Sequence, residues 1–264
     1  MIVGIDIDDT MTNHCNSWFQ VYNDHFKKEN VEDLKIEDAY KWNFYDDWDK
    51  ENKELLMSAL TSKHPDYYKH LQLFQDVEDV VIKIINSGNT VIIISATSKD
   101  LREAKKKWLL EQIPILTEDD IIFTNNKSLI NVDVMIDDNL LTAKDFRCPY
   151  LLYRRPWNSN KLPYEYSDNI ILVENWKDIE EVLIDMNIID EHMDKSDTIF
   201  SKATKELIVG LKNAKSDKEY IEILNPYIKL WQQQGMLIGM RQINDATMVI
   251  IDDVIKDMKK NNET

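Results

Sequence analysis

Carboxylates crowd the beginning of the chain, where three aspartates fall within four positions. Asp6, Asp8 and Asp9 stand in the stretch MIVGIDIDDT, at the end of an apolar run, and Asp137 and Asp138 end another apolar run, VDVMIDD. Like charges this close together repel one another unless a cation joins them. Mg²⁺ suits such a set, because it accepts a few carboxylates and keeps positions open for water and phosphate oxygens. The aspartates therefore predict a magnesium site with Asp6, Asp8, Asp137 and Asp138 as ligands.

Two further polar segments occur beside apolar runs. The run TVIIIS ends at Ser95 and is followed directly by Ala96 and Thr97. Lys127 comes shortly before the run at 132–137. Taken singly, each motif has a structural explanation, such as a solvated turn, a hydroxyl at a strand end or a loop lysine. Their joint occurrence, each beside its own apolar run, favours a single site that binds a phosphate group.

The elements that must position these residues are short and rich in β-branched side chains. Most of these runs are nearly continuous in apolar character, which is typical of strands buried on both faces of a parallel sheet. Helical patterns at 76–86, 98–111 and 176–187 separate most of them, and this alternation predicts a doubly wound α/β fold. Ligands bind such sheets outside the carboxyl ends of the strands, where the polar segments fall. The six predicted strands span 2–7, 90–95, 121–123, 132–137, 150–153 and 170–173.

Two regions depart from this alternation. Residues 12–75 hold no strand-like run and are rich in aromatic side chains, so we expect a helical insertion after the first strand of an α/β domain at 1–188. Residues 195–264 show helical spacing throughout and are expected to form an all-helical extension. Their apolar side chains exceed what a solitary helix can bury, which favours a homo-oligomer or a docked partner.

The composition argues against nucleic acid and membranes as partners and indicates the compartment. The 264 residues carry a formal charge of -16, from 48 acidic and 32 basic residues, which makes a nucleic-acid partner unlikely. No apolar stretch approaches the length of a membrane span, and we expect no membrane partner. Cys15 and Cys148 lack metal-ligand spacing and are expected to be free thiols in a reducing compartment, which places the protein in the cytoplasm.

Four segments together resemble the motifs of the haloacid dehalogenase superfamily of phosphotransferases: DIDDT, IIIISAT, Lys127 and MIDD. The likeness covers residues 1 to about 188. It implies that Asp6 is a nucleophile that forms an aspartyl-phosphate, and that Asp8 is the general acid and then the base. Ser95, with Ala96 beside it, would hold a phosphoryl oxygen, and Lys127 would neutralise charge.

The same resemblance implies how magnesium is held. Asp138 would ligate the ion together with Asp6 and the main-chain carbonyl of Asp8. Asp137 would reach the ion directly or through water. Phosphoryl transfer depends mainly on positioning and charge neutralisation, so this arrangement fits the chemistry.

A second likeness narrows the family. YRRPWN at 153–158, the double aspartate and the small cap that the helical insertion at 12–75 would form are similar to features of the 5'(3')-deoxyribonucleotidases, which remove phosphate from deoxyribonucleoside monophosphates. The resemblance implies a nucleoside monophosphate substrate and gives Arg154 or Arg155 a role in anchoring the ester. That family often carries Gly after the second motif aspartate, where this chain has Asp9, which we interpret as a turn residue.

Aromatic faces stack on nucleobases, and the cap offers a cluster of them in YKWNFYDDW at 40–48. Trp42, Phe44 and Tyr45 are the candidates for lining a base pocket. Three alternatives stay open: another small phosphate ester, a terminal phosphate on a polynucleotide, and a non-catalytic protein that acts through its C-terminal helices. The sequence does not decide the base, the sugar or the 5' or 3' position.

Overall fold

The computed structural model describes residues 1–60, 66–159 and 169–191, which belong to one compact unit running from Met1 to His192. Its centre is a six-stranded sheet in the order β3-β2-β1-β4-β5-β6, in which every pair of neighbours is parallel. The doubly wound α/β fold is confirmed, and each strand lies within its predicted range. The strands are β1 (Ile2–Ile5), β2 (Thr90–Ser95), β3 (Ile121–Phe123), β4 (Val134–Asp137), β5 (Tyr150–Tyr153) and β6 (Ile170–Val173).

Both faces of the sheet are covered, because neighbouring residues of each strand point to opposite sides. Val3 and Ile5 pack into one apolar cluster with α4 (Val77–Asn86), α5 (Arg102–Gln112) and α7 (Trp176–Asp185). Met135 and Leu152 pack into the other cluster, with Ala143 of α6 (Leu140–Ala143). Burial on both sides explains why these strands are almost wholly apolar in sequence.

Gly4 sits where the sheet has no room for a side chain. It pairs with Ile92 on one side and Met135 on the other. A Cβ atom at this position would lie 2.9 Å from the Met135 sulfur and 3.0 Å from a Val132 methyl carbon. The glycine therefore allows close packing in the strand that carries Asp6.

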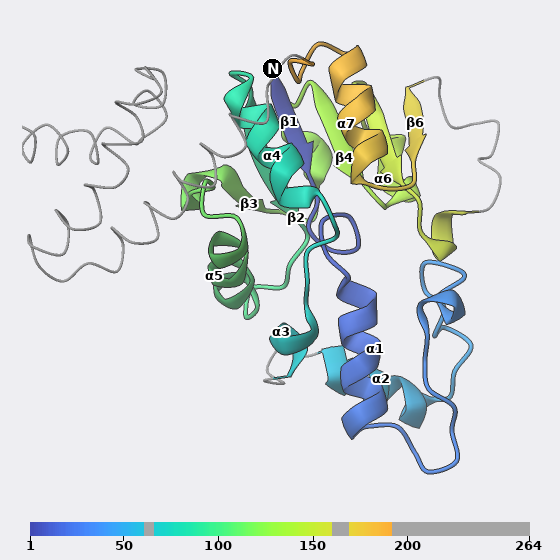
Figure 1. The fold of residues 1–264 in the computed structure, drawn as a ribbon. Helices are drawn as coiled ribbons and strands as arrows, with labels where there is room; N and C mark the ends of the chain where they lie inside the picture. Colours follow the sequence, from blue (N-terminus) through green and yellow to red (C-terminus); the bar gives the residue numbers. More distant parts are fainter. Residues whose placement is uncertain (61–65, 160–168, 192–264) are drawn as a thin grey trace, which may run out of the picture. The chain divides into compact units, whose positions relative to one another are not determined.

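The region between β1 and α4 is helical, as expected, and lies beyond the carboxyl ends of the strands (Figure 1). It contains α1 (His14–His25), the 3₁₀ turn η1 (Ile36–Asp38), α2 (Lys50–Leu60) and α3 (Tyr67–His70). Its two connections run side by side: the Asn13 N–H donates to Gln72 O at 3.1 Å, and the Phe74 N–H to Met11 O at 2.8 Å. These two hydrogen bonds join the segments that enter and leave the helical region, which lies over the carboxyl ends of the strands.

The remaining helical elements are short, and one predicted boundary is wrong. The helix expected at 98–111 begins at Arg102, and Ser98 lies before it, with its hydroxyl bonded to the Asp100 carboxylate. Three 3₁₀ turns complete the unit: η2 (Glu118–Asp120), η3 (Lys127–Leu129) and η4 (Pro156–Asn158). The described helices are all too short or too polar to cross a membrane. The extension expected at 195–264, with its association surface, lies outside the described residues.

Candidate active site

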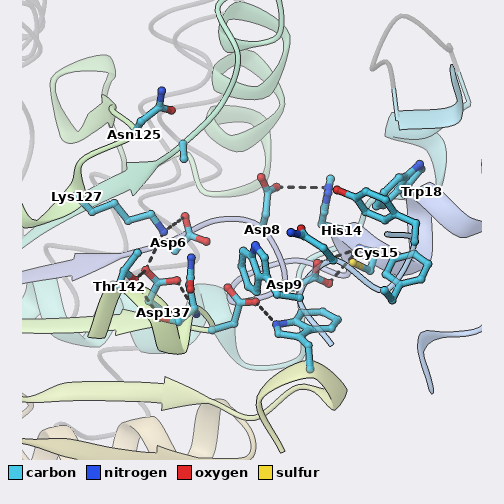
Figure 2. A pocket seen from close by; sticks show the side chains of 18 residues that line it. Asp6, Asp8, Asp9, His14, Cys15, Trp18, Asn125, Lys127, Asp137 and Thr142 are labelled. Atoms are coloured by element: carbon cyan, nitrogen blue, oxygen red, sulfur yellow. Dashed lines mark hydrogen bonds and ion pairs between the residues drawn. The ribbon is translucent and has the colours of Figure 1, made fainter. Parts of the chain in front are cut away.

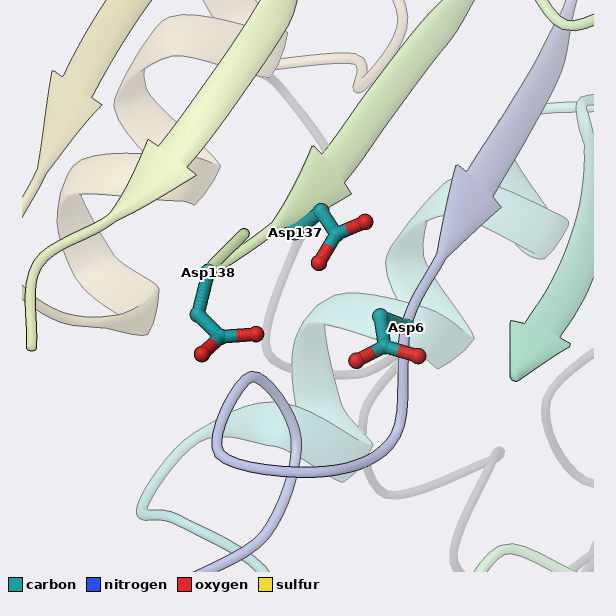
Figure 3. Close-up of side chains that lie close together, drawn as sticks. All are labelled: Asp6, Asp137 and Asp138. Atoms are coloured by element: carbon teal, nitrogen blue, oxygen red, sulfur yellow. The ribbon is translucent and has the colours of Figure 1, made fainter. Parts of the chain in front are cut away.

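Three buried carboxylates meet at the carboxyl ends of the two central strands, as Figure 3 shows. Asp6 follows β1, and Asp137 and Asp138 end and follow the neighbouring β4. Each side chain can offer one oxygen such that these atoms all lie within 4.8 Å of one another. The fold thus brings together three of the four predicted magnesium ligands through their side chains.

Lys127 provides the compensating charge within this cluster. Its ammonium lies 2.8 Å from Asp6 Oδ1 and 2.8 Å from Asp137 Oδ2, and all three side chains are buried. Burial raises the pKa of Asp6 to about 7, an effect that Lys127 opposes and that Asp137 and Asp8 reinforce. Burial also raises the pKa of Asp138 well above its usual range, with Asp137 adding to the rise.

One ammonium does not balance three carboxylates. When its carboxyl groups are ionised, this buried set of hard oxygen donors carries net negative charge, which suits a hard divalent cation. The residues therefore fit Mg²⁺.

Asp8 lies in a different environment from Asp6, because its carboxylate points toward α5 and α1. Lys105 Nζ donates to Asp8 Oδ1 at 2.7 Å and to Oδ2 at 2.5 Å. His14 Nδ1 lies 3.6 Å from Asp8 Oδ1, as Figure 2 shows. His14 in turn shares a 2.5 Å hydrogen bond with the Tyr67 hydroxyl of α3. Burial raises the pKa of Asp8, but Lys105 and His14 lower this pKa by more. The result is a pKa of about 2. The Asp8 carboxylate is therefore ionised in this arrangement.

Sequence reasoning missed Lys105, although the sequence carried a signal for it. Lys105 falls on the same helical face as Leu101, Trp108 and Leu109, three or four residues apart, and its side chain is 6% exposed. A lysine in an apolar stripe needs a buried partner, since an unpaired charge is strongly disfavoured there. That partner is Asp8.

The predicted phosphate-binding residues do not all face the pocket. Lys127 and Ala96 line it. Ser95 is fully buried, its hydroxyl shares a 2.9 Å hydrogen bond with the Thr97 hydroxyl, and it is not among the described lining residues. Its predicted contact with a phosphoryl oxygen stays a prediction; the Ser95 hydroxyl could donate to such an oxygen while it accepts from the Thr97 hydroxyl.

A pocket of about 310 Å³ connects the carboxylates to the helical region, a volume within the usual range for small-molecule sites. Asp6, Asp137 and Lys127 lie at one end, and His14, Cys15 and Trp18 from α1 lie at the other (Figure 2). All three aromatic residues predicted to line a base pocket border it: Trp42, Phe44 and Tyr45. They differ in exposure, since Trp42 is 45% exposed and Phe44 is 4% exposed and packs against Trp18 and Phe19.

The segment after β5 contacts the site differently from what was expected. Arg154 donates to Ser159 O, and neither Arg154 nor Arg155 is among the described residues that line the pocket. Arg155 instead lies 3.5 Å from the Asp9 carboxylate. Their predicted role in anchoring the ester finds no support in this geometry. The residues of this segment that do reach the site are Trp157 and Asn158, which both hydrogen-bond to Asp138 and which sequence reasoning missed.

Asp9 occupies a turn position, as expected. Its φ of 55° lies in the left-handed region that Gly adopts most easily and that Asp tolerates better than most residues. Its buried carboxylate accepts the Cys15 N–H in the first turn of α1, with both oxygens at 3.1 Å. The side chain thus links the β1 loop to the helical region.

A family model and two bacterial proteins match the sequence of this chain. A family model described as "5' nucleotidase, deoxy (Pyrimidine), cytosolic type C protein" matches residues 1–189. A 5'(3')-deoxyribonucleotidase of Bacillus subtilis is 24% identical over 189 residues, which is 69% of this chain and 98% of that protein. One of Clostridium acetobutylicum is 27% identical over 159 residues, covering 60% of this chain and 84% of that protein.

Solved structures with a similar fold include two hydrolases. A haloacid dehalogenase-like protein from Streptococcus pneumoniae aligns with 14% identity and a TM-score of 0.47, covering 69% of this chain and 97% of that one. A HAD family hydrolase from Deinococcus radiodurans, with bound phosphate and sodium, aligns with 11% identity and a TM-score of 0.46, covering 72% and 97%. The predicted resemblance to the 5'(3')-deoxyribonucleotidases is confirmed by the family model and by the two bacterial relatives. By the match over residues 1–189, the chain belongs to the family of the cytosolic type C 5'-deoxynucleotidases.

Proposed function

We propose that the protein is a magnesium-dependent phosphomonoesterase that hydrolyses (deoxy)ribonucleoside monophosphates to nucleoside and phosphate through an aspartyl-phosphate. The observation that carries this proposal is the Asp6 carboxylate, buried at the floor of the pocket, 2.8 Å from Lys127 and beside Asp137 and Asp138. A carboxylate can attack an anionic ester only where cations screen the approach.

The first step forms a bond from an Asp6 oxygen to phosphorus as the bond to the leaving oxygen breaks. Asp6, Asp138 and Asp137 would hold Mg²⁺, with the main-chain carbonyl of Asp8 as a further ligand. The ion supplies positive charge that offsets the phosphate oxygens. Lys127 neutralises charge on Asp6 and on the phosphoryl group.

Asp8 serves the two steps in opposite protonation states. In the first step its carboxyl group donates a proton to the leaving oxygen. In the second step its carboxylate takes a proton from water, the water oxygen attacks phosphorus, and the bond to Asp6 breaks. The ion pair with Lys105 favours the ionised form, which the second step needs, so the first step requires this ion pair to open.

The aromatic end of the pocket supports a nucleoside as the leaving group. Trp42 presents an exposed face there, and stacking on a base contributes about 1–3 kcal/mol. The names of the two bacterial relatives point to deoxyribonucleotides. A cytoplasmic location also stays a prediction.

The test is phosphate release from a panel of 5' and 3' nucleoside monophosphates and sugar phosphates, with Mg²⁺ and with EDTA. We expect nucleotides to be hydrolysed fastest, and only with Mg²⁺. Asp6→Asn should abolish turnover, whereas Asp119→Asn, a matched change at an exposed aspartate of η2, should not. Silence of the wild-type protein on every ester would overturn the proposal, and faster turnover of sugar phosphates would overturn the substrate class.

A further inference from the structure

Asp138 is the member of the carboxylate cluster without a cationic partner. Lys127 contacts Asp6 and Asp137, and none of the ion pairs among the described residues includes Asp138. A buried carboxyl group in that position ionises readily only when hydrogen-bond donors or a bound cation stabilise its charge.

The donors that hold it come mainly from one short segment after β5. The indole N–H of Trp157 donates to Asp138 Oδ2 at 2.8 Å, and the side-chain amide of Asn158 donates to the Asp138 main-chain oxygen at 2.7 Å. The Thr10 hydroxyl reaches Oδ1 only at 3.5 Å. The Trp157 bond is therefore the short contact that fixes the carboxylate itself, and it leaves Oδ1 available for a ligand.

Trp157 itself contacts both Arg155 and Trp42. The Arg155 guanidinium lies 5.4 Å from its ring and 5.0 Å from the ring of Phe74, which stacks on Tyr153 at the end of β5. Trp42 of the helical region also meets Trp157 edge to face, with the ring centroids 6.2 Å apart. These contacts restrain the Trp157 ring, whose indole N–H points to Asp138 Oδ2.

We propose that Trp157 is a positioning residue for the metal centre: its N–H orients Asp138 as a ligand and thereby sets the affinity for the divalent ion. This inference rests on the proposed function, since it assumes that Asp6, Asp137 and Asp138 bind a metal. Hydrogen-bond partners of ligating carboxylates typically change metal affinity by about 10- to 100-fold when they are removed.

The test measures Mn²⁺ binding to the full chain without any phosphate ester, by the electron paramagnetic resonance signal of free Mn²⁺. Trp157→Phe keeps an aromatic ring and removes the N–H, and we expect a dissociation constant about 10- to 100-fold higher than that of the wild type. Trp157→His should recover most of the loss, because imidazole Nε2 occupies the same ring position as indole Nε1. Trp48→Phe, an equal change in the helical region outside the pocket, should bind Mn²⁺ like the wild type.

The outcomes separate the two hypotheses. Circular dichroism and thermal melting confirm that each variant is folded. If the wild type binds Mn²⁺ and folded Trp157→Phe binds it equally well, the positioning role is wrong and the proposed function stands. A role for the N–H is also contradicted if Trp157→Phe and Trp157→His bind Mn²⁺ equally weakly. The same holds if the control Trp48→Phe binds Mn²⁺ as weakly as Trp157→Phe. If the wild type itself binds no Mn²⁺, the metal centre fails and this inference fails with it.

Discussion

Replacing Asp6 by Asn in the metal-free protein tests whether the buried negative charge of Asp6 lowers the free energy of unfolding. Asp6 is 5% exposed, and burial raises its pKa from 3.8 to about 7. Asparagine has nearly the same shape and no charge. We expect Asp6→Asn to remove the pH dependence that this one carboxyl group imposes on stability.

The sign follows from proton binding. Between pH 3.8 and about 7 the folded protein holds a proton on Asp6 that the unfolded chain has released, so the free energy of unfolding falls as the pH rises through this window. At about 1.4 kcal/mol per pKa unit, the Asp6 contribution to this fall is about 4 kcal/mol. It is absent below pH 3.8 and complete above about pH 7.

Urea unfolding in EDTA, followed by circular dichroism at pH 4 and pH 8, measures the effect. The loss of stability between these two pH values should be smaller in Asp6→Asn than in the wild type by about 4 kcal/mol. Asp119→Asn serves as the control and should follow the wild type. An equal loss in Asp6→Asn and the wild type would refute the reasoning, since it would mean that Lys127 fully offsets burial.

Three other changes test separate parts of the structure. Lys105→Met removes the ammonium that lowers the pKa of Asp8, so carbon NMR should show this pKa rising from about 2 by at least about one unit; an unchanged value contradicts the pairing. Gly4→Ala places a Cβ atom 2.9 Å from the Met135 sulfur and should lower the free energy of unfolding in urea by about 1–3 kcal/mol. Trp42→Ala should raise KM for a nucleoside monophosphate by about 10-fold or more, and leave KM for p-nitrophenyl phosphate nearly unchanged. A similar rise for both esters would exclude stacking.

The sheet and its polar ends could be predicted because local sequence determines them. A parallel strand that is buried on both faces is a short apolar run, and the residue that follows it reaches the carboxyl edge of the sheet. Asp6, Asp137 and Asp138 each stand at or directly after such a run, so their meeting follows once the strands are neighbours. Lys127 was predicted from its motif and not from any local pattern.

The contacts that depend on long-range packing could not be predicted in this way. Trp157 and Asp138 are 19 residues apart, and no periodicity relates them. Arg155 carries a charge that suits a phosphate, yet its position between the rings of Phe74 and Trp157 turns it toward Asp9. The late start of α5 at Arg102 likewise reflects the path of the chain after β2, which the helical pattern at 98–111 does not specify.

The charge of the pocket explains how an acidic protein could accept an anionic ester. The described lining residues include five aspartates and one lysine, Lys127. A phosphate dianion that approaches these carboxylates is repelled, and the repulsion is stronger in a buried site than in water. A dication bound among Asp6, Asp137 and Asp138 reverses the local sign where the phosphate must sit. The overall charge of -16 therefore does not by itself exclude anion binding, because a bound ion would set the sign of the field at the site.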